Sequence, residues 1–375
     1  MIGGLTLSLL MGPGVPLPAP RFVLDALQSV KVTAESTDTQ SGFELTFAIE
    51  KDSPLISLFL LSGSVSIPLF RVLLIATLSG RPETLIDGVA TQTQIVPGGK
   101  HGSATLTVQG KDLSAAMDVL PFDGLPYPAM PPVARVALVL AKYAFLGIIP
   151  KLIPSLEEPP IPTDRIPRHK GSDLSYVRKL AEEAGYLFRM EPGPTPGTSF
   201  AYWGPEIRIG TPQPALTVDS DAADTAENLS FRFDKEGTEL PIVFIQNQQT
   251  RAPIPIPIPS SIPFLPPLGL VPPLPPKITP LSDTAQLSPV QALVRGFAYA
   301  ARHSNAVQGS GTLDVLRYGR LLRPGGPVGV RGAGLAFDGL HYVERVTSNL
   351  TRTSFKQDFA LSRSGLLPST GSVVV

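Results

Sequence analysis

This chain of 375 residues contains four histidines whose imidazoles could take part in acid–base or metal chemistry. They are His101, His169, His303 and His341. None of them has the spacing to another histidine or to a carboxylate that a helical zinc motif or a fixed histidine–carboxylate pair needs. The chain has no cysteine, which excludes thiolate catalysis, cysteine metal sites and disulfides. We therefore interpret the histidines as surface, turn or core residues.

Carboxylates gather at two places where metal binding or paired-acid chemistry is conceivable. Glu157-Glu158 lies in a proline-rich segment, where adjacent side chains project in different directions. The aspartates Asp219, Asp221 and Asp224 lack the glycine and the terminal glutamate of a calcium loop. We interpret both groups as solvated loop residues and predict no metal site.

Two glycine-rich stretches resemble catalytic motifs only in part. Gly309-Ser-Gly311 is not the Gly-x-Ser-x-Gly elbow of hydrolases and is typical of a helix-to-strand turn. Gly98-Gly-Lys100 lacks both the upstream glycine and the following Ser or Thr of a phosphate-binding loop. The sequence thus predicts no catalytic, cofactor or metal site, and we expect a protein that acts by binding, without turnover.

The composition indicates a subunit of a permanent assembly. Lysine and arginine together number 31, as do aspartate and glutamate, so no basic excess points to nucleic acid. Only 17% of residues are charged, 43% are hydrophobic and 42 are proline, which is little charge to cover a soluble monomer. Burial of apolar surface against other subunits explains this balance. The length allows two to three domains.

Two apolar stretches need an interpretation other than membrane targeting. Residues 1–10 lack a positively charged n-region, so we predict an extended N-terminal arm over 1–20 that docks on a neighbour, with assembly in the cytoplasm. The stretch 54–78 is interrupted by Pro68, Arg71 and the polar segment 62–66 before about 20 apolar residues accumulate. We predict two buried strands joined by a turn and no membrane span.

A pattern of strands and turns occurs twice in the chain and predicts one β-unit used twice. The first copy comprises 74–80, Asp87-Gly88 and 104–108. The second copy comprises 328–330, 331–334, Asp338-Gly339, 342–346 and 355–361. Alternation of apolar and polar residues at 43–49 and 229–233 is typical of further strands with one buried face. We therefore expect a first β-domain over 21–118 and a second over 217–375.

Helical spacing predicts an insertion between these two domains. Apolar residues keep helical spacing over 133–146, and a second helix runs from the cap at Ser172 to Gly185, followed by a strand at 186–190. We expect a proline-rich α/β insertion domain over 119–216. The fold class is then mainly β with an α+β insertion.

Prolines dominate one loop of the second β-domain. Twelve of the residues 253–280 are proline, which disfavours a helix or a central strand, so we predict a polyproline-like surface loop over 251–281. Ser288-Pro289 is a cap followed by proline at the first helical position, and it predicts a helix over about 288–305.

Several of these segments resemble one known family. Residues 172–188 are similar to the "Ser-Asp-Leu … Leu-Ala-Glu-Glu-x-Gly" segment of phage tail hub proteins and of the spike-base proteins of type VI secretion. Further matches to the late control protein D family and to baseplate hubs of contractile injection systems are 110–113, 309–313, 322–330, 337–339, 341–343 and 353–361. The chain is identified on these residues as a suspected hub without a fused spike.

The resemblance implies a homotrimer with two related β-barrel domains in each subunit. Such a trimer would join a six-fold tail tube to a three-fold central spike in the baseplate of a phage tail or an injection system. The implied partners are the spike protein, the inner tube proteins and other baseplate proteins, with no nucleic-acid specificity.

Two other functions remain open from the sequence. A tail-associated cell-wall hydrolase would need a carboxylate or histidine constellation. A surface adhesion protein with β-sandwich domains would account for the prolines and the two β-regions, but it would usually carry a signal peptide.

Overall fold

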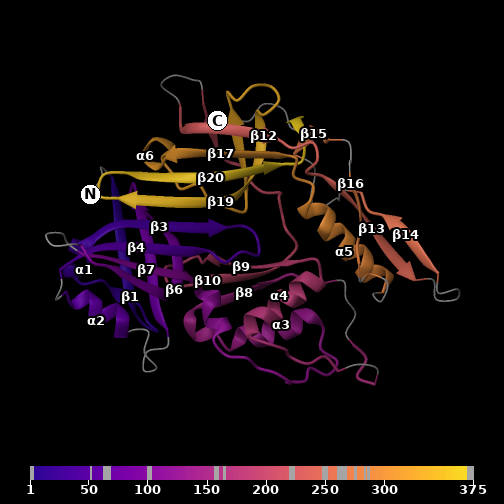
Figure 1. The fold of residues 1–375 in the computed structure, drawn as a ribbon, viewed down its shortest axis with the longest axis horizontal. Coiled ribbons are helices and arrows are strands. Elements are labelled where there is room, and N and C mark those ends of the chain that lie inside the picture. The colour runs from indigo at the N-terminus through magenta and orange to yellow at the C-terminus, as the bar shows by residue number, and fades with distance from the viewer. Residues whose placement is uncertain are drawn as a thin grey trace.

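The computed structural model describes residues 4–50, 53–61, 69–98, 104–155, 160–163, 166–218, 224–246, 252–259, 268–273, 277–282, 284 and 288–369. Strands dominate it, and the helices are spread along the chain (Figure 1). The predicted fold class, mainly β with an α+β insertion, is confirmed.

Thirteen strands form one large sheet, whose path runs β12-β17-β20-β19-β3-β4-β7-β6-β5-β1-β2, with β18 beside β19 and β11 beside β18. The strands are β1 (Leu5–Pro13), β2 (Leu17–Pro18), β3 (Leu27–Glu35), β4 (Gly42–Ile49), β5 (Phe70–Leu78), β6 (Arg81–Val96), β7 (Ala104–Asp112), β11 (Gln213–Thr217), β12 (Ala226–Phe233), β17 (Val307–Asp314), β18 (Pro327–Arg331), β19 (Gly339–Thr351) and β20 (Phe355–Arg363).

The sheet contains the same unit twice. In the N unit, β3 and β4 are followed by the helix α2 (Pro54–Leu61) and by the meander β5-β6-β7. In the C unit, β12 and β17 are followed by the helix α6 (Val315–Tyr318) and by the meander β18-β19-β20. The spatial orders, β3-β4-β7-β6-β5 and β12-β17-β20-β19-β18, correspond strand for strand. The predicted duplication is therefore confirmed.

The two Asp-Gly pairs that suggested the duplication are not equivalent positions. Gly88 lies within β6, opposite Val72 of β5. The corresponding place opposite Val328 of β18 belongs to His341, whereas Gly339 begins β19. The topology repeats, but the Asp-Gly dipeptide is used differently in each copy.

The two units share one core because β3 of the N unit pairs antiparallel with β19 of the C unit, from Ser29↔Thr351 to Glu35↔Arg345. The largest hydrophobic cluster accordingly includes Leu45 and Leu106 of the N unit and Val330 and Phe359 of the C unit. Pairing of strands more than 300 residues apart joins the halves of the chain into one body.

One prediction near the N-terminus is wrong. Residues 54–61 form α2 rather than a strand, because a short apolar run that begins with proline fits the first turn of a helix equally well. The predicted turn at 62–66 lies outside the described residues. The predicted N-terminal arm is extended, and β1 pairs along its whole length with β5 of the same chain. The helix α1 (Arg21–Ala26) follows it.

The insertion has its own core between a three-stranded sheet and two helices. Trp203, Leu174 and Val139 are among the buried residues of that core. The predicted helix over 133–146 is divided into an α-helix and a 3₁₀ turn. The elements are η1 (Leu113–Asp118), α3 (Pro132–Ala141), η2 (Ala144–Leu146), β8 (Ile148–Leu152), α4 (Asp173–Glu183), β9 (Leu187–Pro192) and β10 (Ser199–Gly204).

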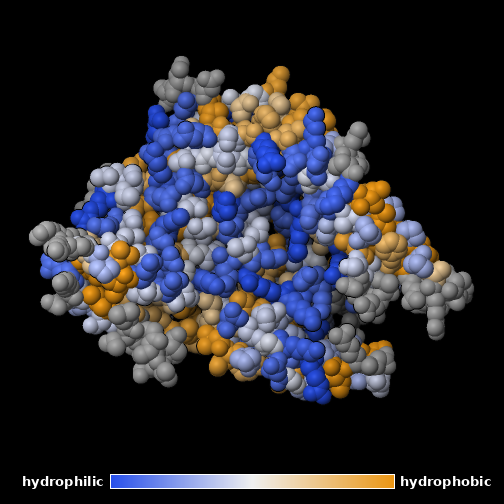
Figure 2. All heavy atoms as spheres, in the orientation of Figure 1, coloured by the Kyte–Doolittle hydropathy of each residue, from blue (hydrophilic) through white to orange (hydrophobic). Residues whose placement is uncertain are grey.

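The described part of the proline-rich segment contains edge strands, where a polyproline-like surface loop was predicted. β14 (Pro253–Pro257) and β16 (Lys277–Pro280) are the edge strands of a small sheet around β13 (Glu239–Gln246), and β15 (Gly269–Val271) pairs with β21 (Leu366–Pro368). Edge strands tolerate proline because one side needs no donor. The helix α5 (Pro289–Arg302), which begins with a capping box at Ser288, covers this small sheet. Figure 2 shows apolar residues gathered on the projecting small sheet, where Ile254 and Ile278 are exposed.

Candidate functional site

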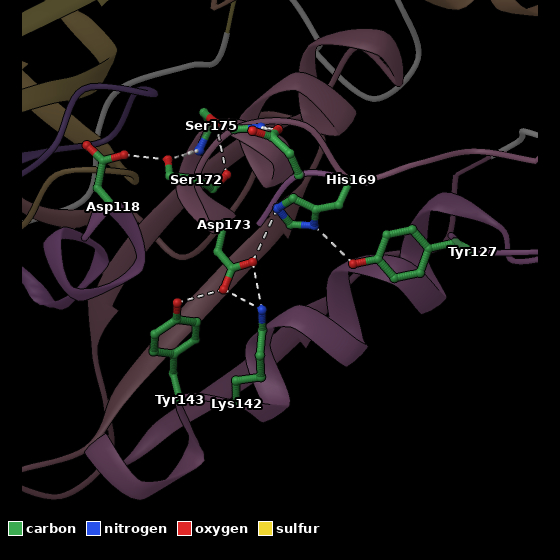
Figure 3. A network of polar contacts seen from close by, with 10 residues as sticks. Asp118, Tyr127, Lys142, Tyr143, His169, Ser172, Asp173 and Ser175 are labelled. Carbon is green, nitrogen blue, oxygen red and sulfur yellow. Dashed lines mark hydrogen bonds and ion pairs between the residues drawn. The ribbon is translucent and has the colours of Figure 1, made fainter. Parts of the chain in front are cut away.

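A network of polar side chains surrounds the first turn of α4 in the insertion (Figure 3). The helix begins there because the Ser172 side chain accepts a hydrogen bond from the Ser175 backbone N–H, which caps the helix. Asp173 occupies the first turn, where the helix dipole favours a negative charge. The local sequence therefore fixes a carboxylate at this point.

Asp173 is fully buried and receives donors from the two residues that follow α3. Lys142 Nζ lies 2.8 Å from Oδ1 and 2.6 Å from Oδ2, and the Tyr143 hydroxyl donates to Oδ2 at 2.7 Å. These contacts compensate for the removal of the carboxylate from water. They tie α3 to the start of α4.

His169 connects the carboxylate to an aromatic cluster. Its Nε2 lies 3.3 Å from Asp173 Oδ1, and its Nδ1 lies 3.0 Å from the Tyr127 hydroxyl. The ring stacks on Tyr176 at 4.1 Å between centroids. Burial lowers the pKa of His169 from its usual value, and burial also raises the pKa of Tyr127 to about 12. Near neutral pH both groups are therefore uncharged.

This arrangement orders side chains and offers little for catalysis. A histidine beside a carboxylate resembles part of a hydrolytic triad, but the group on the other ring nitrogen is a buried tyrosine. The hydroxyl of Ser172, the N-cap of α4, donates to Asp118 at the end of η1 (Figure 3). The network therefore joins η1, the end of α3 and the start of α4.

The other predicted site residues are dispersed. His341 is buried in β19, and burial together with the nearby Arg363 lowers its pKa to about 3. His303 ends α5, with Nδ1 2.9 Å from the Tyr299 carbonyl oxygen. His101 lies outside the described residues.

Most of the carboxylate and glycine candidates fall where the structure describes no residues. Glu157, Glu158, Asp219 and Asp221 lie outside the described residues, and so do 99–100 of the Gly-Gly-Lys stretch. Gly309-Ser-Gly311 lies inside β17, so it is strand and not a helix-to-strand turn.

Two wider features follow from the part of the chain that the structure describes. Within it, no three histidine or carboxylate side chains lie close enough together to hold a metal ion. None of the helices in that part has the length and apolar character to cross a membrane.

Two buried arginines are structural residues that sequence patterns did not reveal. Arg71 of β5 donates to both carboxylate oxygens of Asp87 in β6, at 2.7 and 2.6 Å, and to the Gly197 carbonyl of the insertion at 2.8 Å. Arg363 donates to the backbone carbonyls of three residues, including Asp338 at 2.8 Å and Gly365 at 2.7 Å. Arg71 and Arg363 meet their partners only in the folded chain. The spacing of residues in the sequence therefore does not predict these contacts.

No protein-family model and no curated protein sequence matches the chain. Solved structures do match it. The tail protein from Neisseria meningitidis MC58 superposes with a TM-score of 0.63 at 14% identity, over 97% of this chain and 98% of that one. The 43 kDa tail protein of prophage MuSo2 from Shewanella oneidensis gives a TM-score of 0.62 at 12% identity, over 96% and 99%.

A third match lies outside phages. An E. coli component of the type VI secretion system, described as structurally similar to the T4 bacteriophage tail proteins gp27 and gp5, gives a TM-score of 0.53 at 14% identity, over 92% of this chain and 74% of that one. At these identities the matches establish the fold. The chain has the fold of phage tail proteins and of related type VI secretion proteins, as the resemblance implied.

Proposed function

We propose that the protein is a structural hub at the centre of a contractile tail or injection-system baseplate. Three copies would form a ring that joins a six-fold tail tube to a three-fold spike. The observation that carries this proposal is the repetition of one β-unit within the chain, combined with the unequal elaboration of its two ends.

At one end of the large sheet, the N and C units share two kinds of connection, although β2 and α1 also lie there in the N unit. The connections there are α2 and α6, which lead from the second strand of each unit to the third, and the turns between the last two strands. In Figure 1 this end lies at the left, with α1, α2 and α6. A ring of three chains would present six similar units on this face.

At the other end, the two units differ. The segments 113–212, 234–306 and 332–338 all leave the sheet there, since β7, β12 and β18 all end on the side where β19 begins. Figure 1 shows the insertion below the large sheet and the small sheet of β13, β14 and β16 at the right. These segments occur once per chain, so a trimer would present them three times.

A rotation about the axis of the ring does not move any residue along that axis. The ends that carry the α2 and α6 connections would therefore lie on one face of the ring in all six units. That face suits a six-fold tube, and the elaborated face suits a three-fold spike. The matches to tail proteins support a structural, tail-associated role.

The remaining expectations form part of this proposal. We retain the arm at 1–20, the β-domains at 21–118 and 217–375 and the insertion at 119–216 as the domain division. We also infer cytoplasmic assembly followed by incorporation into a phage tail or injection-system particle. Tube proteins, a spike protein and other baseplate proteins would be the partners, and the role would be binding without turnover.

The test is the molar mass of the purified chain, measured by light scattering behind a sizing column, followed by electron microscopy of the same peak. We expect the mass of three chains and a ring with six similar lobes. A monomer at micromolar concentration, or a closed ring with another number of chains, would contradict the trimeric hub.

A further inference from the structure

The junction between the two units provides a template for the contact between chains. On one flank of β19, β18 pairs with residues 339–342 and β3 pairs with residues 345–351. On the corresponding flank of β6, residues 71–78 of β5 pair with residues 81–89. Among the described residues no strand continues beside 90–96, where the equivalent of β3 would lie. In the part of the chain that the structure describes, residues 90–96 of β6 therefore have no neighbouring strand on this flank.

A second free edge lies at the far end of the same sheet. β12 is the C-unit equivalent of β3, and it pairs with β17 on one flank only. In the N unit the other flank of β3 is taken by β19. One chain thus has an unfilled position beside β6 and an unpaired strand of the type that fills it.

We propose that β12 of one chain pairs antiparallel with residues 90–96 of β6 in the next chain, as β3 pairs with β19 within the chain. This inference rests on the ring of the proposed function and names its interface. Each chain then offers two different edges, and such head-to-tail contacts close into a ring when every junction repeats the same rotation.

The equivalence of the two units fixes the register of this pairing. A row of paired residues runs through Ala90, Gly110, Phe43 and Val32 in the N unit. The matching row in the C unit is Val343, Leu361, Gly309 and Phe231.

A bulge confirms this alignment, because the β6·β7 ladder shifts between Ala90 and Gln92 and the β19·β20 ladder shifts between Val343 and Arg345. Since Thr347 pairs with Thr33 inside the chain, Gln94 should stand opposite Arg232 of the next chain. Ile95 should stand opposite Phe231.

Residues at the proposed interface are less buried than their equivalents at the internal junction, as expected if a neighbouring chain is missing. Val32 and Ser348, which meet at the internal junction, are 2% and 5% exposed. Their counterparts Phe231 and Ile95 are only partly buried, although both pack against the main core. A neighbouring chain would cover them.

The chain protects an edge elsewhere but leaves these two open. In β14, prolines alternate with isoleucines that stand opposite Ile245 and Val243. Because proline has no N–H, the isoleucines supply the donors to β13, and the outer edge lacks N–H groups for a further strand. The segments 90–96 and 226–233 contain no proline. They remain competent for strand addition.

Cysteine cross-linking tests the register, since the chain contains no cysteine of its own. The variant carries Gln94→Cys and Arg232→Cys together. At the internal junction the equivalent hydroxyls of Thr33 and Thr347 lie 3.4 Å apart, so the positions are close enough for a disulfide. Thr33→Cys with Thr347→Cys is the positive control and should form a bond within one chain.

The readout is a non-reducing gel after mild oxidation, combined with light scattering. We expect covalent dimers and trimers from the double variant, none from either single variant, and none from Gln94→Cys with Asn228→Cys, which is displaced by four residues along β12. A trimer by light scattering without these cross-links would overturn the proposed interface while leaving the hub intact. A monomer would contradict the hub itself.

Discussion

Replacement of Asp173 by alanine should loosen the insertion while leaving the large sheet folded. The carboxylate is fully buried and holds Lys142 and Tyr143 of the α3 end against α4. Its removal leaves the Tyr143 hydroxyl without this acceptor. Lys142, whose side chain is 38% exposed, can turn back to water.

The magnitude follows from these two contacts. A hydrogen bond from a hydroxyl to a charged carboxylate contributes roughly 1.5–3 kcal/mol. An ion pair that is partly exposed adds about 0.5–1 kcal/mol. We therefore expect Asp173→Ala to lower the free energy of unfolding of the insertion by about 2–4 kcal/mol, less than the loss of a fully buried ion pair.

Trp203 gives a local assay because it is the one tryptophan of the chain and lies in the core of the insertion. Urea unfolding would be followed by its fluorescence, and by far-ultraviolet circular dichroism for the sheet. Glu183→Ala is the matched control, since this residue of the same helix forms an exposed ion pair with Lys179 at 3.9 Å. That change should cost less than about 0.5 kcal/mol.

The reasoning is refuted if Asp173→Ala shifts the fluorescence transition no more than Glu183→Ala does. If the free energy of unfolding falls equally by fluorescence and by circular dichroism, the effect is not confined to the insertion. Asp173→Asn, which retains an acceptor for Tyr143, should fall between the two variants.

Three further predictions concern the sheet. The pKa of His341 is about 3 in the folded chain and near 6.5 in the unfolded chain. Below pH 6.5 the unfolded chain therefore binds more protons, and stability should fall as the pH drops from about 6.5 towards 3. In His341→Gln, urea titrations at a series of pH values should show a weaker dependence. Ile95→Lys should convert trimer to monomer by light scattering, whereas Val96→Lys, on the opposite face of the strand, should leave the trimer intact. Asp87→Ala should cost about 3–5 kcal/mol by leaving Arg71 buried and uncompensated, and a loss below 1 kcal/mol in urea unfolding would contradict that pairing.

Local patterns predicted the elements whose residues are close in sequence. The alternation at 43–49 gave β4, and the capped segments gave α4 and α5 almost at their observed ends. The duplication was also visible, since turn residues and strand spacing recur, although the Asp-Gly pairs that marked it occupy different places.

Contacts between distant segments were beyond these patterns. The pairing of β3 with β19 depends on edges that appear only after both units have folded. The network around Asp173 joins residues from Tyr127 to Tyr176, and the sequence alone gave His169 no partner. The strand β14 was not predicted, because proline has no backbone N–H to donate. An edge strand does not need that donor on its outer side.

The order of strands along the chain also sets an order of folding during synthesis. β3 to β7 are complete by Asp112, so the N unit can form while most of the chain is still being made. β12 ends at Phe233, but its partner β17 begins only at Val307, after the whole segment that carries the small sheet and α5. An emerging chain therefore cannot offer a fixed β12 to a neighbour until translation has passed β17, and subunit association is delayed until nearly all of the chain has left the ribosome.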